Sequence, residues 1–279
     1  MTINTYESDT DSGCKIWELF LEKQIDRLIS IEPSLRFSAV AHISDVHAIY
    51  SSIIEDAISI RMLGANGRLN QSYILARAFL ERLINYCFLQ ISSKDEYENF
   101  IDYSANKAGR RLSRTMVANG RVKAKIEYAG GEYELPSHIQ KAIDKFTSEN
   151  GREKTRWTKL GLPERAAIVE SECEKSGLFM HLLCIYSDAS EAIHGTLYGA
   201  LFHLGTYDPQ SAPTDQSSLD KHRYATLSMI YLILGSAIDT LFSFLNHLGE
   251  HVVEEISQSS ELDFKLAAIK TGLVKAGAS

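Results

Sequence analysis

The sequence predicts an all-α protein, and three observations lead to that fold class. Apolar residues recur at intervals of three and four along most of the 279 residues, the spacing that places side chains on one face of a helix. Glycine and proline stand between these periodic segments, and 44% apolar with 23% charged residues is an ordinary globular composition. We therefore expect a bundle of about seven or eight helices, with a flexible tail at 1–13 and a single domain at 14–279.

Three helices open the predicted bundle. The first covers Lys15–Glu32 and ends before Pro33, because proline lacks the N–H that a helix interior needs. The second covers Ser38–Leu63 and ends at the turn Gly64-Ala-Asn-Gly67, where glycine can take a positive φ. The third covers Gln71–Ile91. Because its apolar residues surround most of its circumference, we expect it at the centre of the bundle.

The middle of the chain, residues 92–177, has a different character. Charges are dense, apolar residues are scattered, and Gly130, Gly131 and Pro136 interrupt the segment. Residues 126–128 and 132–135 alternate polar and apolar side chains around the glycine pair, which is typical of a short hairpin. Two helices joined by a loop are the alternative. We predict the helices, with an irregular and charged connection.

Three more helices complete the pattern, at Gly177–Leu204, His222–Leu248 and Ser260–Lys275. The most apolar run, Tyr224–Ile238, has 15 uncharged residues and ends at Asp239. Because a bilayer needs roughly 18 to 20 apolar residues, we interpret this run as a buried core helix and expect no membrane contact.

The four cysteines form no C-x-x-C pair, and the polar, acidic start of the chain does not resemble a signal peptide, so we predict a cytoplasmic protein.

Two stripes of polar side chains run along otherwise apolar helices, at four-residue intervals. They comprise Tyr73, Arg77, Glu81 and Asn85 in the third helix, and Tyr186, Ser190, His194 and Tyr198 in the Gly177–Leu204 helix. An isolated charge in a dry core costs several kcal/mol, so Arg77 and Glu81 need partners or a water-filled pocket. We expect them to face His194 and Tyr186, with an Arg77–Glu81 pair on the same helix. A structural network that fixes helix register is the alternative to a ligand or catalytic pocket.

With these motifs the chain resembles an uncharacterised family of bacterial all-helical proteins. The likeness rests on an R-x-x-x-E helix, on Trp157 with Leu160 to Ala167 after it, and on a late Y-x-x-x-S-x-x-x-H helix; it covers roughly residues 38–248. That family is distantly similar to the helical nucleotide-binding and RNase-toxin superfamily of phage-defence and toxin–antitoxin systems.

If the protein is an enzyme, we assign Arg77 to phosphate stabilisation, His194 to acid or base work, Glu81 to orienting the histidine, and Tyr186 with Ser190 to hydrogen bonding. The RNases of the superfamily carry an R-x(4–6)-H motif. Here the matching positions are Ser187, Asp188 and Ala189, so Arg77 would have to supply the missing cation from the opposing helix.

One short motif in the sequence is typical of a metal site. Glu191-x-x-His194 is the unit that di-iron bundles use, but no second copy is present, so a metal-binding bundle is only an alternative. We predict no metal and no cofactor.

Positive charge is concentrated in residues 107–125. This stretch holds seven basic residues and no acidic one, although the chain carries 29 Lys and Arg against 36 Asp and Glu. The basic residues are Lys107, Arg110, Arg111, Arg114, Arg121, Lys123 and Lys125. Such a stretch can bind phosphate by counterion release, and Trp157, with basic neighbours of its own, can stack on a base. A solvated face, or an interface in a homo-oligomer or with an acidic partner protein, is the alternative.

These observations lead to one functional hypothesis and two rivals. We expect a component of a defence or toxin system that engages RNA or nucleotide phosphate; if it is an enzyme, it is an RNase-like or phosphate-directed hydrolase. A non-catalytic helical interaction module is the first rival, and a metal-binding bundle is the second.

Overall fold

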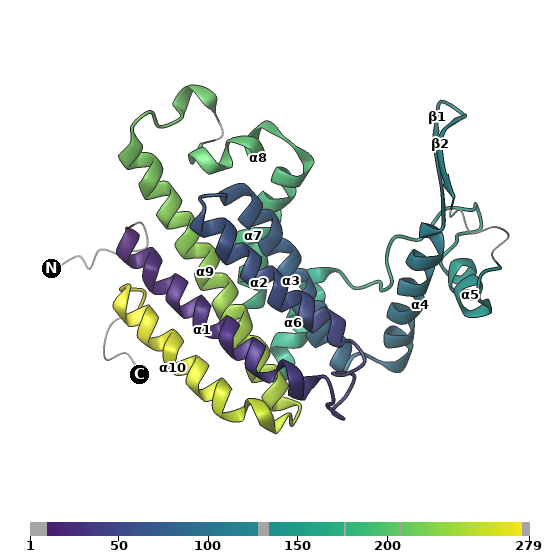
Figure 1. The fold of residues 1–279 in the computed structure, drawn as a ribbon, viewed down its shortest axis with the longest axis horizontal. Helices are drawn as coiled ribbons and strands as arrows, with labels where there is room; N and C mark the ends of the chain where they lie inside the picture. Colours follow the sequence, from purple (N-terminus) through teal and green to yellow (C-terminus); the bar gives the residue numbers. More distant parts are fainter. Residues whose placement is uncertain (1–9, 128–133, 176, 207, 275–279) are drawn as a thin grey trace. The chain divides into compact units, whose positions relative to one another are not determined.

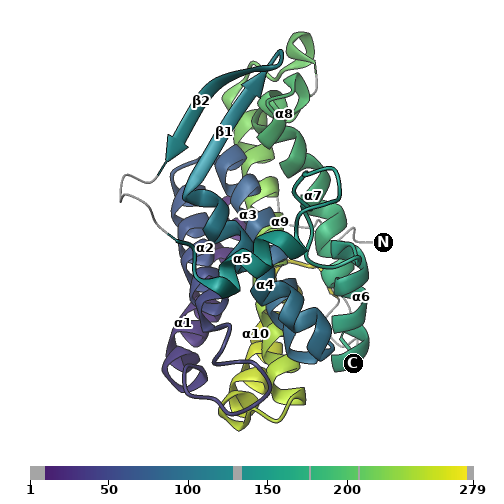
Figure 2. The ribbon, with the colours of Figure 1, turned by 90° about the vertical axis from the view of Figure 1, so that its right-hand side faces the viewer.

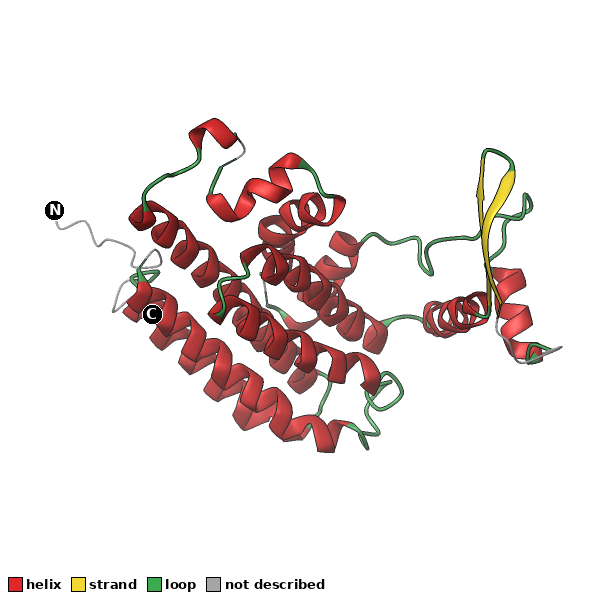
Figure 3. Ribbon diagram, turned by 45° about the horizontal axis from the view of Figure 1, so that its top comes forward, coloured by secondary structure: helices red, strands yellow, loops and turns green. Residues whose placement is uncertain are grey.

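A computed structural model describes residues 10–127, 134–175, 177–206 and 208–274. The chain forms two compact units, which we call the core unit (residues 1–90 and 162–279) and the inserted unit (residues 91–161). Apart from one two-stranded hairpin, the described residues form helices and the loops between them (Figure 3). The prediction of an all-α protein is confirmed, although the described chain has ten α-helices rather than seven or eight.

The core unit contains eight of these helices (Figure 1). They are α1 (Asp11–Leu35), α2 (His47–Ala65), α3 (Leu69–Ile91), α6 (Leu162–Cys173), α7 (Leu178–His194), α8 (Leu197–Leu201), α9 (Gln216–His247) and α10 (Glu254–Lys270). Helix α9 packs against α1, α2, α6, α7 and α10. The backbones of α1 and α9 come close where Gly235 leaves room for the ring of Phe20.

Helix α9 is the one described helix whose length and composition would allow it to cross a membrane. Its most apolar 18-residue window has a mean hydropathy of 1.6, and 78% of that window is buried inside the protein. Such burial is typical of a core helix, and it agrees with the interpretation of Tyr224–Ile238. Asp239, which ends the uncharged run, accepts a hydrogen bond from Ser260 Oγ of α10 at 2.5 Å. Burial raises the pKa of this carboxyl.

Helix α3 contacts α2, α6 and α7 through its side chains, and most of its residues are buried, as predicted for a central helix. Side chains tie it to each neighbour. Tyr73 donates to the carbonyl of Cys184 on α7 at 2.5 Å, Arg82 pairs with Asp56 on α2, and Arg165 on α6 donates to Asn85.

Several predicted helix ends are wrong. Helices α9 and α10 begin before their predicted starts, at Gln216 rather than His222 and at Glu254 rather than Ser260, and α10 ends at Lys270 rather than Lys275. Helix α1 begins at Asp11, inside the predicted tail, because Thr10 caps it by accepting from Gly13 N at 3.1 Å; it then runs past Pro33 to Leu35. Helix α2 begins at His47 rather than Ser38, after a series of turns. The predicted Gly177–Leu204 helix ends at His194, because Gly195 takes the left-handed conformation (φ 67°).

The inserted unit contains α4 (Lys94–Arg111), β1 (Ser113–Ala118), β2 (Arg121–Glu127) and α5 (Ser137–Lys145). Residues 146–161 follow α5 and run back along α4, and we call them the return segment. The strands pair antiparallel as a ribbon (Figure 2), with Ala118 opposite Arg121 and a bulge between Met116 and Val117. Asn119 and Gly120 form the turn, and both have positive φ (52° and 69°), as a tight two-residue hairpin turn requires.

The prediction of helices with an irregular connection is therefore wrong for residues 113–127, which form the hairpin. The hairpin considered as an alternative was centred on Gly130 and Gly131, and residues 128–133 lie outside the described part of the chain.

Candidate functional site

The first candidate site is the Arg77 cluster, formed by Arg77 of α3 with Tyr186 and Ser190 of α7. Arg77 Nη1 donates to Ser190 Oγ at 2.8 Å, and Nη2 donates to the Tyr186 hydroxyl at 2.9 Å. The guanidinium also lies 4.1 Å from the centre of the Tyr186 ring, within the range of a cation–π interaction. The structure thus brings the two polar stripes together at these three residues.

Tyr73 extends this contact by one turn of α3. Its hydroxyl donates to the carbonyl of Cys184, and burial raises the pKa of Tyr73 far above its usual value. The hydroxyl therefore stays protonated and acts as a donor. On α7, Asp188 accepts a hydrogen bond from the Tyr198 hydroxyl at 3.0 Å.

Glu81 and His194 are not part of this cluster. Within the described chain, the predicted Arg77–Glu81 pair is absent, because both terminal nitrogens of Arg77 donate to α7. Glu81 is half-buried. His194 is the last residue of α7 and is exposed, one turn beyond Ser190, with no hydrogen bond or ion pair among the described residues. Arg77 is therefore bound by two neutral hydroxyl groups. It forms no ion pair with a carboxylate among the described residues.

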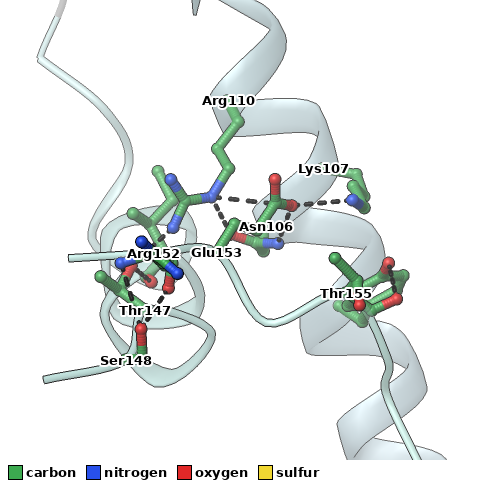
Figure 4. A network of polar contacts seen from close by, with 10 residues as sticks. Asn106, Lys107, Arg110, Thr147, Ser148, Arg152, Glu153 and Thr155 are labelled. Atoms are coloured by element: carbon green, nitrogen blue, oxygen red, sulfur yellow. Dashed lines mark hydrogen bonds and ion pairs between the residues drawn. The ribbon is translucent and has the colours of Figure 1, made fainter. Parts of the chain in front are cut away.

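The second candidate site lies in the inserted unit, where Glu153 organises part of the predicted basic stretch (Figure 4). Its carboxylate accepts from Lys107 Nζ at 2.8 Å and from Asn106 Nδ2 at 3.2 Å, and it lies 3.8 Å from Arg110 Nε. The hydrogen bond from Lys107 holds the pKa of Glu153 below its usual value, and the same bond raises the pKa of Lys107. Lys107 and Arg110 therefore hold the return segment against α4.

The remaining cations of the stretch belong to the end of α4 and to the hairpin. Arg111, Arg114, Arg121 and Lys123 are exposed, and within the described residues they have no hydrogen bond or ion pair. Lys125 pairs with Glu127. We call the β1–β2 hairpin together with Arg111 the basic ribbon. Its apolar side chains are exposed as well: Met116, Val122 and Ile126 have 64%, 61% and 66% of their surface accessible.

Trp157 belongs to the return segment and packs against α4. Its ring meets that of Phe100 edge-on, with centroids 5.2 Å apart and an interplanar angle of 76°. Two neighbouring contacts fix the segment on either side: Thr158 Oγ1 donates to Glu96 Oε1 at 2.7 Å, and the Tyr103 hydroxyl donates to the carbonyl of Thr155 at 2.8 Å. The indole is therefore held in a defined position.

Among the described residues, no group of three or more His, Cys, Asp or Glu side chains is arranged to hold a metal ion. Glu191 and His194 accordingly find no further ligand in that part of the chain.

The shape of the basic stretch was missed at the sequence level, although two signals were present. Asn119-Gly120 is the dipeptide most typical of a two-residue hairpin turn, and Arg121-Val-Lys-Ala-Lys-Ile-Glu127 alternates charged and apolar residues with the period of a strand. Read together, they would have placed Arg121, Lys123 and Lys125 on a strand.

Comparison with known families adds one finding. The model of a family of unknown function, DUF5677, matches residues 46–211, which is more than half of the chain and includes the Arg77 cluster and the whole inserted unit. Neither a curated protein nor a solved structure matches the chain. The chain therefore belongs to the DUF5677 family, whose function is unknown.

Proposed function

We propose that this protein binds single-stranded RNA through the inserted unit, with the basic ribbon contacting the phosphate backbone. The observation that carries the proposal is the set of four exposed cations, Arg111, Arg114, Arg121 and Lys123, for which the described chain provides no anionic partner. Cations that are not neutralised within the protein are the groups that replace the counterions of a nucleic acid.

The distribution of charge supports the same conclusion. The inserted unit has 14 Lys and Arg against 10 Asp and Glu, a net charge of +4, whereas the core unit has 15 against 26, a net charge of -11. A polyanion is therefore attracted to the inserted unit and repelled by the core unit. Exposed apolar side chains on the ribbon add surfaces that can contact unstacked bases.

The test is the salt dependence of RNA binding. A variant with Arg111, Arg114, Arg121 and Lys123 all replaced by Gln is compared with the wild-type protein, using a fluorescent single-stranded RNA between 50 and 200 mM salt. Each lost phosphate contact should reduce the slope of log K against log salt by about 0.7, so the variant should lose about 3 in slope.

The matched control removes four exposed cations of the core unit: K15Q, R36Q, K265Q and K270Q. It changes the net charge by the same amount, so it should lower affinity only slightly and leave the slope nearly unchanged. Equal slopes for the wild-type protein and the ribbon variant would contradict the proposal.

A phosphate-directed hydrolase is a second candidate, and one observation favours it: Arg77 is oriented by Tyr186 and Ser190 yet has no described carboxylate partner. Arg77 would steady a phosphate, and His194, one turn further along α7, would transfer the proton. RNA-directed chemistry of this kind fits the defence or toxin setting that the sequence resemblance implies.

Cleavage of a labelled RNA by the wild-type protein and by H194A tests this second candidate. H194A should abolish cleavage without lowering the melting temperature, since the ring is exposed and makes no described contact. RNA that the wild-type protein leaves intact, or that H194A cleaves equally well, contradicts the hydrolase assignment.

A further inference from the structure

An open groove of about 740 Å³ lies within the inserted unit. It is lined by Glu96 and Asn99 of α4, by Lys145 at the end of α5, and by residues of the return segment. The volume falls within the range of small-molecule sites, roughly 300 to 1,000 Å³. The groove is thus large enough for one nucleotide.

Four of the groove's lining residues are cations: Lys145, Lys154, Arg156 and Lys159. Two of them have internal partners, because Lys145 pairs with Asp102 at 2.5 Å and Lys154 Nζ donates to the carbonyl of Lys145 at 2.9 Å. Arg156 and Lys159 are exposed and have no hydrogen bond or ion pair within the described chain. These two side chains are therefore available to a phosphate group.

The groove also contains an aromatic ring in a fixed position. The edge-on contact with Phe100 holds Trp157, which is half-buried. Stacking of a base on an aromatic side chain contributes about 1–3 kcal/mol, and a ring that is already held loses little freedom on binding. Of the protein's two tryptophans, Trp17 is fully buried in the core unit, so Trp157 is the one that lines the groove.

Glu96 is the one carboxylate among the residues that line the groove. Its Oε1 accepts a hydrogen bond from Thr158 Oγ1, whereas its Oε2 is buried and has no hydrogen-bond partner. A buried acceptor without a donor is costly. Glu96 lines the groove, so rotation of its carboxylate would expose Oε2 to a ligand N–H and relieve this cost. Guanine presents two adjacent N–H donors, at N1 and N2, on its pairing edge. Adenine and cytosine present a ring acceptor beside their amino group, which the carboxylate would repel.

We propose that this groove, the Trp157 groove, binds a guanosine monophosphate unit. The base stacks on Trp157, its N1 and N2 donors reach Glu96, and Arg156 and Lys159 hold the phosphate. This proposal rests on the proposed function, because it names the nucleotide that the inserted unit takes.

Calorimetric titration of the full-length protein with GMP, AMP and ribose 5-phosphate tests the proposal. GMP should bind at least tenfold more tightly than AMP or ribose 5-phosphate, a difference of about 1.4 kcal/mol. R156Q/K159Q should weaken GMP binding at least tenfold, and E96Q should remove most of the preference for GMP over AMP. The matched control K94Q/K141Q changes two exposed cations of the same unit outside the groove and should bind GMP like the wild-type protein.

Three results would overturn the groove assignment: no heat of binding for GMP at millimolar concentration, equal affinity for GMP and ribose 5-phosphate, or unchanged GMP affinity in R156Q/K159Q. Equal affinity for GMP and AMP would overturn the role of Glu96. Circular dichroism establishes that each variant is folded.

The bound guanosine could belong to a free nucleotide or to an RNA strand, and a competition experiment distinguishes the two. A nine-nucleotide uridine oligomer with one central guanosine is compared with the all-uridine oligomer. Displacement of GMP by the guanosine oligomer identifies a strand, and displacement by GTP or GDP alone identifies a free nucleotide; both outcomes support the shared chemistry.

The ribbon variant separates this inference from the proposed function. It should lose RNA affinity and still bind GMP, because none of its four substitutions lines the groove. If the protein binds GMP but the ribbon variant binds RNA as tightly as the wild-type protein, only the proposed function is contradicted. If the ribbon variant loses RNA affinity but the wild-type protein does not bind GMP, only the further inference is contradicted.

Discussion

At the scale of single residues, side chains on successive turns of α3 attach this helix to its neighbours. Tyr73 and Arg77 reach α7, Arg82 reaches α2, and Asn85 accepts from α6. The need of Arg77 for partners could be predicted from its position on an apolar helix. The identity of those partners could not, because the choice among Tyr186, Ser190 and His194 depends on how far each residue of α7 lies from α3.

Replacing Arg77 by Met tests how much the Arg77 cluster stabilises the core unit. Met keeps the apolar stem but removes two hydrogen bonds and the contact with the Tyr186 ring, so the free energy of unfolding should fall by about 2 kcal/mol. Urea denaturation measures the change. H194A is the control and should change stability by less than about 0.5 kcal/mol. If both variants lose the same stability, the cluster is not a structural contact.

His181 should make stability depend on pH. Burial lowers the pKa of His181 from 6.5 to about 4, and its Nδ1 has no hydrogen-bond partner. Between these two pH values the unfolded chain binds a proton at this ring and the folded chain does not, so the free energy of unfolding should fall as the pH is lowered from 6.5 towards 4. More than one pH unit above 6.5 the ring is neutral in both states and contributes almost no pH dependence.

Urea denaturation of the wild-type protein and of H181F at pH 7.5, 6 and 5 checks this prediction. The variant should lose less stability than the wild-type protein between pH 7.5 and 5, because Phe has no group to protonate. The carboxyl groups are the same in both proteins, so their contribution cancels. Parallel pH profiles would show that His181 is not the group responsible.

At the scale of elements, helix ends were the least predictable feature. Pro33 lies in the last turn of α1, where its missing N–H costs one hydrogen bond, and the helix continues to Leu35 with Arg36 N bonded to the carbonyl of Glu32 at 3.2 Å. The dipeptide Gly195-Thr196 could have predicted the break between α7 and α8 from the sequence. Gly195 takes the left-handed conformation, and the side chain of Thr196 accepts from Gly199 N at 3.1 Å to begin α8.

The contact between α1 and α9 leads to a prediction for G235A. A Cβ at this position would lie 2.4 Å from Cε1 of Phe20, so the two helices must separate or the ring must move. The variant should lose about 2 kcal/mol of stability, although alanine at an unhindered helix position would be stabilising. Thermal melting measures the loss. S217A, at an exposed position of the same helix, is the control and should melt at or slightly above the wild-type temperature.

An unchanged melting temperature in G235A would mean that α1 and α9 do not approach each other as closely as described. S217A also raises helix propensity but lies away from the contact with Phe20, so a loss confined to G235A would come from packing.

At the scale of the whole molecule, the two units differ in how much they bury. In the inserted unit the buried residues of the described chain are Asn106, Gly109, Ala142, Phe146 and Thr158. The core unit buries most of α3, nearly half of the residues of α9 and one face of α1. Every hairpin side chain whose burial is described is exposed, and an isolated two-stranded hairpin is only marginally stable.

Hydrogen exchange should therefore divide the chain at these boundaries. Amides of the ribbon and of α5 should exchange much faster than those of α1, α3 and α9, because local opening costs less where little apolar surface is buried. Addition of RNA should slow exchange in the ribbon if the proposed function holds. Uniform protection across residues 10–274 would contradict the division into two units.

Composition and periodicity were sufficient to predict the fold class, the central place of α3 and the core character of α9, because each depends on local spacing of apolar residues. The concentration of positive charge was also visible in the chain. Only the tertiary structure decided that Arg77 meets Tyr186 and Ser190, and that Trp157 lies in a groove with Arg156 and Glu96. It also decided that Glu153 engages Lys107 and Arg110, whereas four cations of the ribbon have no ion pair among the described residues. Those contacts join residues far apart along the chain, and their geometry depends on how the backbone returns, which local patterns do not specify.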